Sequence, residues 1–277
     1  MKKNRVRMLP EKQVSAILSF IKEKSSLEKG IFNKVLRDDI FQLLERQDCI
    51  VLYYPKEDEE NGGFHVMHPL CGKLKKFVYI NTAQLKETQI FAAAHELGHI
   101  WGIVDYMKEK GFSDTDEADW DEWIINRFAA ELLMPNDAFH YYCEREFAII
   151  DEQYKHNQIP LISVISVITA IMNEFLTPFK SVVHRFYELG VISNDIAFML
   201  LEEYDLGEVY SAAMCVVLEC DYLLSDDNKA IRHIGSITKR VAQRFINVYN
   251  RQQCCDLVKE TGLMRRKELR LLGHKVK

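Results

Sequence analysis

The sequence predicts an α+β fold: a helix-rich core with a small sheet, followed by an all-helical C-terminal region. Glycine and proline are scarce, at 12 and 6 of 277 residues, and apolar residues recur at helical spacing along most of the chain. Three short runs rich in β-branched and aromatic residues interrupt this pattern. With 48% hydrophobic residues the chain can bury a substantial core, which excludes an overall disordered protein.

The expected elements follow from these patterns in chain order. They are two amphipathic helices at 14–21 and 32–44, three strands at 49–54, 64–67 and 76–80, and two longer helices at 88–103 and 116–134. Asp114, with Glu117 three residues later, is expected to cap the last of these helices, and Pro135 to end it. Beyond Pro135 the pattern predicts helices to the end of the chain.

Cysteine usage and hydropathy indicate the compartment. The seven cysteines are odd in number and scattered, and they form no C-x-x-C pair, so a disulfide framework fits poorly and a reducing compartment is the simpler interpretation. No stretch approaches the ~18 apolar residues of a membrane span, and no apolar run follows the basic N-terminus. We therefore expect a cytoplasmic protein without a membrane partner.

The net charge of −5 hides a basic C-terminal segment. From Asn228 to Lys277 there are 13 Lys and Arg residues against three acidic ones. Such a segment suits an acidic partner, nucleic acid or the acidic remainder of the chain. A solvated helical face explains it equally well. No interleaving of aromatic and basic residues supports nucleic-acid binding.

The nonapeptide FAAAHELGH at 91–99 carries the strongest chemical signal. Residues four apart share one helix face, so the imidazoles of His95 and His99 can reach one metal ion. Glu96 projects about 100° around the helix, where it can take a proton from a metal-bound water. Two histidines that merely line a buried helix face are the other interpretation of this pattern.

A hydrolytic zinc site commonly uses three protein ligands and leaves the fourth position to water. The next long helix offers four carboxylates near its start: Glu117, Asp119, Asp121 and Glu122. We favour Glu122, because Asn126 lies four residues later on the same face and can accept the N–H of a ligating histidine. The remaining carboxylates are explained by the positive end of the helix dipole.

Three segments resemble the ImmA/IrrE family of zinc metallopeptidases: FVYIN at 77–81, IFAAAHELGH at 90–99 and EWIINRFAAELLMP at 122–135. The third is the most diagnostic, since its Asn-x-Phe-Ala-x-x-Leu-Leu-Met-Pro pattern is much longer than a zinc pentapeptide. Family members usually have a second acid and an alanine where this chain has Ile124 and Ile125. That departure leaves Glu122 as the only acid in register.

The resemblance implies a zincin-like, gluzincin-type core that binds Zn²⁺ through His95, His99 and Glu122. In this interpretation Glu96 is the catalytic base and Asn126 orients a ligating histidine. The resemblance also implies a partner, because members typically cut or otherwise inactivate a helix-turn-helix repressor and so derepress mobile-element or stress genes. We therefore expect a zinc endopeptidase that acts on such a repressor.

The expected domain division has three parts: a zinc metallopeptidase domain over 1–150, a helical, helix-turn-helix-like segment over 151–204 and a basic helical region over 205–277. The middle part contains SVVHRFYELGVI at 181–192, which is similar to a segment often found after the peptidase core in this family. An amphipathic helix with a glycine C-cap explains these residues more simply than DNA contact does.

Three further histidines are candidates for contact with a substrate carbonyl or its oxyanion: His65, His68 and His140. Each is more often a surface or half-buried residue in such a position. Two alternatives to an enzyme also stay open. One is a zinc-bearing protein that sequesters or senses a repressor without cutting it, and the other is a nucleic-acid-binding regulator that acts through its basic tail.

Overall fold

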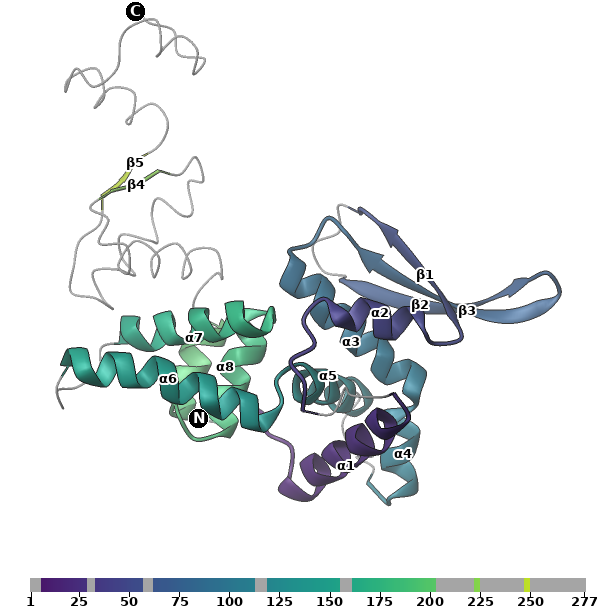
Figure 1. Cartoon of the computed structure of the whole chain (residues 1–277), viewed down its shortest axis with the longest axis horizontal. Coiled ribbons are helices and arrows are strands. Elements are labelled where there is room, and N and C mark those ends of the chain that lie inside the picture. Colours follow the sequence, from purple (N-terminus) through teal and green to yellow (C-terminus); the bar gives the residue numbers. More distant parts are fainter. Residues whose placement is uncertain are drawn as a thin grey trace, which may run out of the picture. The chain divides into compact units, whose positions relative to one another are not determined.

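The first part of the chain joins a three-stranded sheet to helices, of which α2 and α3 cover one sheet face (Figure 1). The computed structural model describes residues 6–28, 33–56, 62–112, 119–154, 161–202, 222–224 and 247–249. The contacts between residues divide the chain into two compact units. The first contains Met1–Phe147 and Ala170–Leu201, and the second contains Ala148–Thr169 and Glu202–Lys277. The predicted α+β class, rich in helix with a small sheet, is confirmed.

The sheet has the order β1-β3-β2, so β1 (Cys49–Tyr54) and β2 (Gly63–Leu70) are its edges and β3 (Lys73–Asn81) its centre. β1 pairs with β3 in parallel, and β2 pairs with β3 as an antiparallel hairpin. Strand β1 is confirmed at its predicted bounds, whereas β2 and β3 are longer than predicted. The turn uses only two residues, both left-handed as a tight hairpin requires, so both strands continue up to it.

The helices of the described residues are α1 Glu11–Leu27, α2 Asp39–Glu45, α3 Lys86–Trp101, α4 Ile103–Glu109, α5 Trp120–Leu133, α6 Asn136–Tyr154, α7 Leu161–Phe175, α8 Phe179–Glu188 and α9 Asn194–Glu202. The helix predicted over 32–44 begins only at Asp39, because the left-handed Arg37 (φ 45°) cannot continue a helix. Gly102 (φ 76°) likewise ends α3 two residues before the predicted end at Ile103, and the short helix α4 that follows was not predicted.

Helix α5 begins at Trp120, later than predicted, and the expected cap at Asp114 and Glu117 lies outside the described residues. Asp119 occupies the N-cap position without a side-chain hydrogen bond to the helix. As a consequence Glu122 stands in the first turn, whereas a helix that begins at residue 116 would place it in the second. Its position alone therefore does not separate Glu122 from the other acidic residues of this helix start.

The contact between α3 and α5 depends on a glycine. A Cβ on Gly98 would lie 2.9 Å from Cδ1 of Phe128 and 3.1 Å from Cγ2 of Ile125. Both of these side chains are fully buried, so neither has free space into which it can retreat. Gly98 thus sets the separation of the two helices, and with it the distance between the residues that face each other across them.

A buried ion network ties α8 to α5. Both Nη atoms of Arg185 donate to the carboxylate of Glu131, at 2.6 and 2.8 Å. Arg127 donates to the same carboxylate, at 2.6 Å from its Nη2, and also pairs with Glu188. Arg185 and Glu131 are each only 2% exposed. The basic residue at the centre of the 181–192 segment is therefore engaged inside the protein and cannot contact a DNA phosphate.

The end of α8 confirms the simpler interpretation of that segment. Gly190 is left-handed (φ 70°), and its N–H donates to the carbonyl of Tyr187. The N–H of Val191 donates to the carbonyl of Phe186 at 2.9 Å. These two bonds form a Schellman motif, the glycine C-cap that the sequence pattern predicts.

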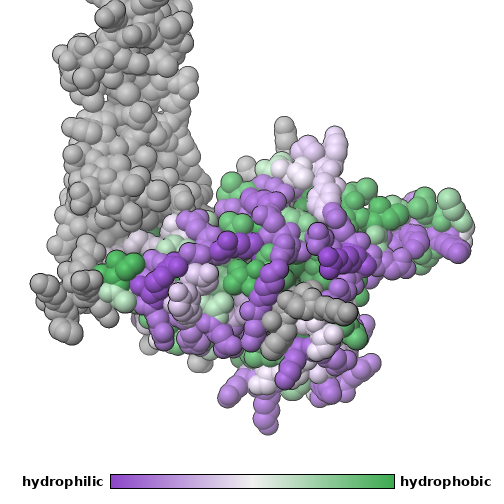
Figure 2. All heavy atoms as spheres, viewed as in Figure 1, coloured by the Kyte–Doolittle hydropathy of each residue, from purple (hydrophilic) through white to green (hydrophobic). Residues whose placement is uncertain are grey.

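Apolar side chains are exposed along the β2–β3 hairpin, the projection at the right of Figure 2, where green residues lie beside purple ones. The most exposed of them are Phe64, Val66, Met67, Leu70 and Leu74. Among the described residues no helix is long and apolar enough to cross a membrane.

In the second unit the described residues include a short pair of parallel strands, β4 (Tyr222–Leu224) and β5 (Asn247–Tyr249). The C-terminal region was predicted to be all-helical, so these six residues are a correction to that prediction. Both segments contain a tyrosine beside branched aliphatic residues, which suit a pleated surface. The predicted division of the chain at residues 150 and 204 stays a prediction.

Candidate metal centre

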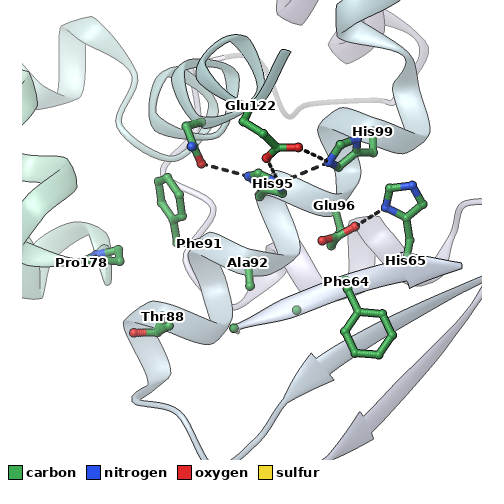
Figure 3. A pocket seen from close by; sticks show the side chains of 13 residues that line it. Phe64, His65, Thr88, Phe91, Ala92, His95, Glu96, His99, Glu122 and Pro178 are labelled. Carbon is green, nitrogen blue, oxygen red and sulfur yellow. Dashed lines mark hydrogen bonds and ion pairs between the residues drawn. The ribbon is translucent and has the colours of Figure 1, made fainter. Parts of the chain in front are cut away.

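Two histidines of α3 point their outer ring nitrogens at one place. The Nε2 atoms of His95 and His99 lie 3.2 Å apart, as the four-residue spacing on one helix face predicts (Figure 3). On the opposite face of α3, Ala94 and Leu97 are fully buried and fix the helix against the core. The two imidazoles are held beside open space, with 18% and 24% of their side-chain surface exposed.

Asn126 of α5 determines which nitrogen of His95 carries the hydrogen. Its side-chain oxygen lies 2.9 Å from Nδ1 of His95, and an amide oxygen can only accept, so Nδ1 donates. The lone pair of the neutral ring is then on Nε2, which faces His99. A lone pair on the outer ring nitrogen, directed toward His99 and Glu122, is what a ligating imidazole presents to a metal ion.

Glu122, one turn before Asn126 on α5, brings a carboxylate to the same place. One of its oxygens lies 3.3 Å from Nε2 of His95, and the other lies 3.9 Å from Nε2 of His99. Ligands at 2.0–2.2 Å in a tetrahedral arrangement are separated by about 3.3 to 3.6 Å. The three groups therefore fit one zinc ion without large movement.

A second group of possible ligands shares His99: His65 of β2, Glu96 and His99 also lie close together. In this group Nδ1 of His65 is 2.7 Å from a carboxylate oxygen of Glu96. That is a hydrogen-bond distance, and it is shorter than the separation of two ligands on one zinc. We therefore interpret His65 and Glu96 as a hydrogen-bonded pair beside the metal position and not as ligands.

The pKa of His99 suits a metal ligand. Burial is the largest cause and the neighbouring His95 and His65 rings add to it, because a second positive charge there is unfavourable; together they lower the pKa of His99 to about 4. The ring is therefore neutral near pH 7, as a ligating imidazole must be.

These groups line a cavity of about 500 Å³ between β2, α3 and α5. The other lining residues are Gly62, Gly63, Phe64, Thr88, Phe91, Ala92 and Pro178. Glu96 and His65 lie on one side of His95, and Phe91 and Pro178 lie on the other (Figure 3). Sequence reasoning missed Thr88 and Phe91, although both precede His95 at helical spacing on the same face.

Of the three histidines proposed for substrate contact, only His65 lines this cavity. His68 lies three residues further along β2, and an odd spacing in a strand points it to the opposite face, where it is exposed. His140 is exposed on α6 and is not part of the cavity lining. Strict strand alternation could have separated His65 from His68, but it could not have shown that His65 meets Glu96.

Comparison with known proteins gives one strong match. Residues 44–187 match the model of the IrrE N-terminal-like domain, Peptidase_M78. A solved Mycobacterium tuberculosis transcriptional regulator is similar at 15% identity and a TM-score of 0.40, with 64% of this chain and 47% of that chain covered. The present chain thus spans about half the length of that regulator. No curated protein matches the sequence. Because the family match spans more than half of the chain and contains the whole constellation around His95, this protein belongs to the IrrE N-terminal-like (ImmA/IrrE) peptidase family.

Proposed function

We propose that the chain is a zinc-dependent endopeptidase whose metal is held by His95, His99 and Glu122. The observation that carries this proposal is the convergence of two imidazole Nε2 atoms and one carboxylate at separations of 3.2, 3.3 and 3.9 Å, close to those that tetrahedral zinc requires. Membership of a peptidase family supports peptide hydrolysis as the reaction. A donor set of two nitrogens and one oxygen also matches known catalytic zinc sites.

When bound, zinc supplies a Lewis acid that makes water acidic enough to attack near neutral pH and that stabilises negative charge on the attacked carbonyl oxygen. Glu96 accepts the proton of the attacking water and delivers it to the departing amine. His65 donates a hydrogen bond to Glu96 and so holds this carboxylate at the edge of the cavity. Asn126 accepts a hydrogen bond from Nδ1 of His95 and so holds the ring of this histidine.

The substrate backbone has a docking edge in this arrangement. Strand β2 is an edge of the sheet, and its residues from Gly63 to His65 line the cavity. An extended peptide can add to such an edge through main-chain hydrogen bonds. A Cβ on Gly62 would lie 3.2 Å from Cβ of Ala92, so the glycine keeps this edge close to α3.

The family resemblance supports a helix-turn-helix repressor as the substrate, whose cleavage would derepress mobile-element or stress genes. Such a repressor works in the cytoplasm, where we place the enzyme. The two alternatives have less support. No contact of the described residues favours sequestration over cleavage, and the buried Arg185 removes one basic residue from any nucleic-acid surface.

The proposal predicts zinc-dependent cleavage. Purified protein should generate new termini in a helix-turn-helix repressor encoded beside its gene, because zinc and Glu96 together activate water. The termini are measured by mass spectrometry for three samples: zinc-loaded protein, protein treated with a chelator, and chelated protein given zinc again. Cleavage should disappear and then return. An intact repressor that binds the protein equally in all three samples would favour sequestration.

A further inference from the structure

A second cavity, of about 370 Å³, lies beside the metal cavity and is named here the α5–α8 cavity. It is enclosed by α3, α5, α8 and the segment before α1. Phe91 and Asn126 line both cavities, so they form the partition between them. Asn126 also holds His95, so one wall of the α5–α8 cavity lies next to a proposed zinc ligand.

The walls of the α5–α8 cavity are largely aromatic and aliphatic. Trp123 and Ala130 lie seven residues apart on one face of α5, and Leu9 and Phe91 complete the apolar lining. The ring of His184 meets Trp123 edge to face, with centroids 5.9 Å apart. An edge-to-face pair of rings still offers ring faces and edges against which a third aromatic ring can pack favourably.

The charges around the α5–α8 cavity are mainly positive. Arg127 is neutralised by its carboxylate partners Glu131 and Glu188. Burial, together with Arg127 and Lys180, lowers the pKa of His184, so its ring is neutral near pH 7. The exposed Lys180 remains as a cation at the rim.

The guanidinium of Arg7 stands 4.7 Å from the ring centroid of Trp123 on the same wall. A basic side chain entering the α5–α8 cavity would meet the like charge of Lys180 at its rim, whereas an uncharged ring would not.

We propose that the α5–α8 cavity is a specificity pocket that receives a large uncharged apolar side chain, preferably aromatic, from a residue flanking the scissile bond, and rejects lysine or arginine there. This inference rests on the proposed function, since it takes the zinc position as the point of cleavage. In this inference the enzyme recognises the side chain of a residue next to the scissile bond in addition to the substrate backbone.

The test uses N-acetylated glycine, phenylalanine and lysine hydroxamates, whose hydroxamate group chelates zinc and whose side chains alone differ. Binding to the zinc-loaded full chain is measured by calorimetry, so that no catalytic turnover is needed. The phenylalanine compound should bind wild type about 10- to 100-fold more tightly than the glycine compound, as expected for a buried aromatic side chain. The lysine compound should show no such gain.

Three variants locate the effect. Ala130→Leu fills the α5–α8 cavity and should remove the preference for phenylalanine while leaving affinity for the glycine compound unchanged. Ala138→Leu, the same change at a half-buried alanine outside both cavities, should keep the preference. Lys180→Glu, at an exposed position that barely affects folding, should raise affinity for the lysine compound.

The outcomes separate the two proposals. If the glycine compound binds but wild type does not discriminate between side chains, the specificity pocket is overturned and the zinc site stands. Equal discrimination by Ala130→Leu and wild type, or an unchanged lysine affinity in Lys180→Glu, also overturns it. If no hydroxamate binds zinc-treated protein, the proposed function fails, and the pocket fails with it.

Discussion

Replacement of Glu96 by glutamine should lower the rate of peptide cleavage by about 10²- to 10⁴-fold, the usual contribution of a general base. Glutamine keeps the size of the side chain and an oxygen that can accept from His65, but it cannot take a proton from water. Glu96 is 3% exposed and is not one of the proposed ligands, so zinc content and fold should be unchanged. The measurement is cleavage rate with zinc content determined on the same samples.

Glu87→Gln is the matched control for this change. Glu87 lies on the same helix but does not line the metal cavity, so its replacement should leave cleavage unaffected. Loss of zinc in Glu96→Gln would mean that Glu96 is a ligand and that the assignment of its role is wrong. Full derepression of the repressor's target genes by Glu96→Gln would instead favour sequestration.

Replacement of Glu131 by glutamine should lower the free energy of unfolding by about 3 to 5 kcal/mol, as expected when one partner of a buried ion pair is removed. The change leaves Arg185 buried without its bidentate carboxylate, and Arg127 loses a partner as well. Stability is measured by urea unfolding of zinc-free protein, because zinc bound to the folded state would add its own contribution.

The control is an exposed ion pair, Lys34 with Asp39, whose side chains are 55% and 57% exposed. Lys34→Met should change the free energy of unfolding by no more than about 1 kcal/mol. If Glu131→Gln is no more destabilising than Lys34→Met, the network does not hold α8 against α5. A loss of stability confined to Glu131→Gln would support that role.

The sequence predicted those parts of the site that a single helix determines. Positions four apart on α3 and α5 share a face whatever the tertiary structure, so His95 could be paired with His99, and Glu122 with Asn126, from spacing within each helix. The structure brings all four together at hydrogen-bonding or ligand-to-ligand distances. The bounds of β1 could also be predicted from the sequence, because its run of branched and aromatic residues ends at a proline.

Contacts between distant segments could not be predicted in this way. His65 meets Glu96 only because the hairpin packs on α3, and the resulting pair is 31 residues apart in sequence. Arg185 resembled a surface residue in an amphipathic pattern, yet it is buried against Glu131, 54 residues away. Helical periodicity identifies a polar face but cannot distinguish solvent from a buried carboxylate as its partner.

The position of zinc tests the central claim most directly. Crystals of the zinc-loaded chain, measured on both sides of the zinc absorption edge, should show one anomalous peak about 2.0 to 2.2 Å from Nε2 of His95, Nε2 of His99 and an oxygen of Glu122. Glu96 and His65 should lie next to the peak without ligating it. A peak coordinated by His65, Glu96 and His99, or by Asp121 in place of Glu122, would contradict the account, as would the absence of a zinc peak at α3.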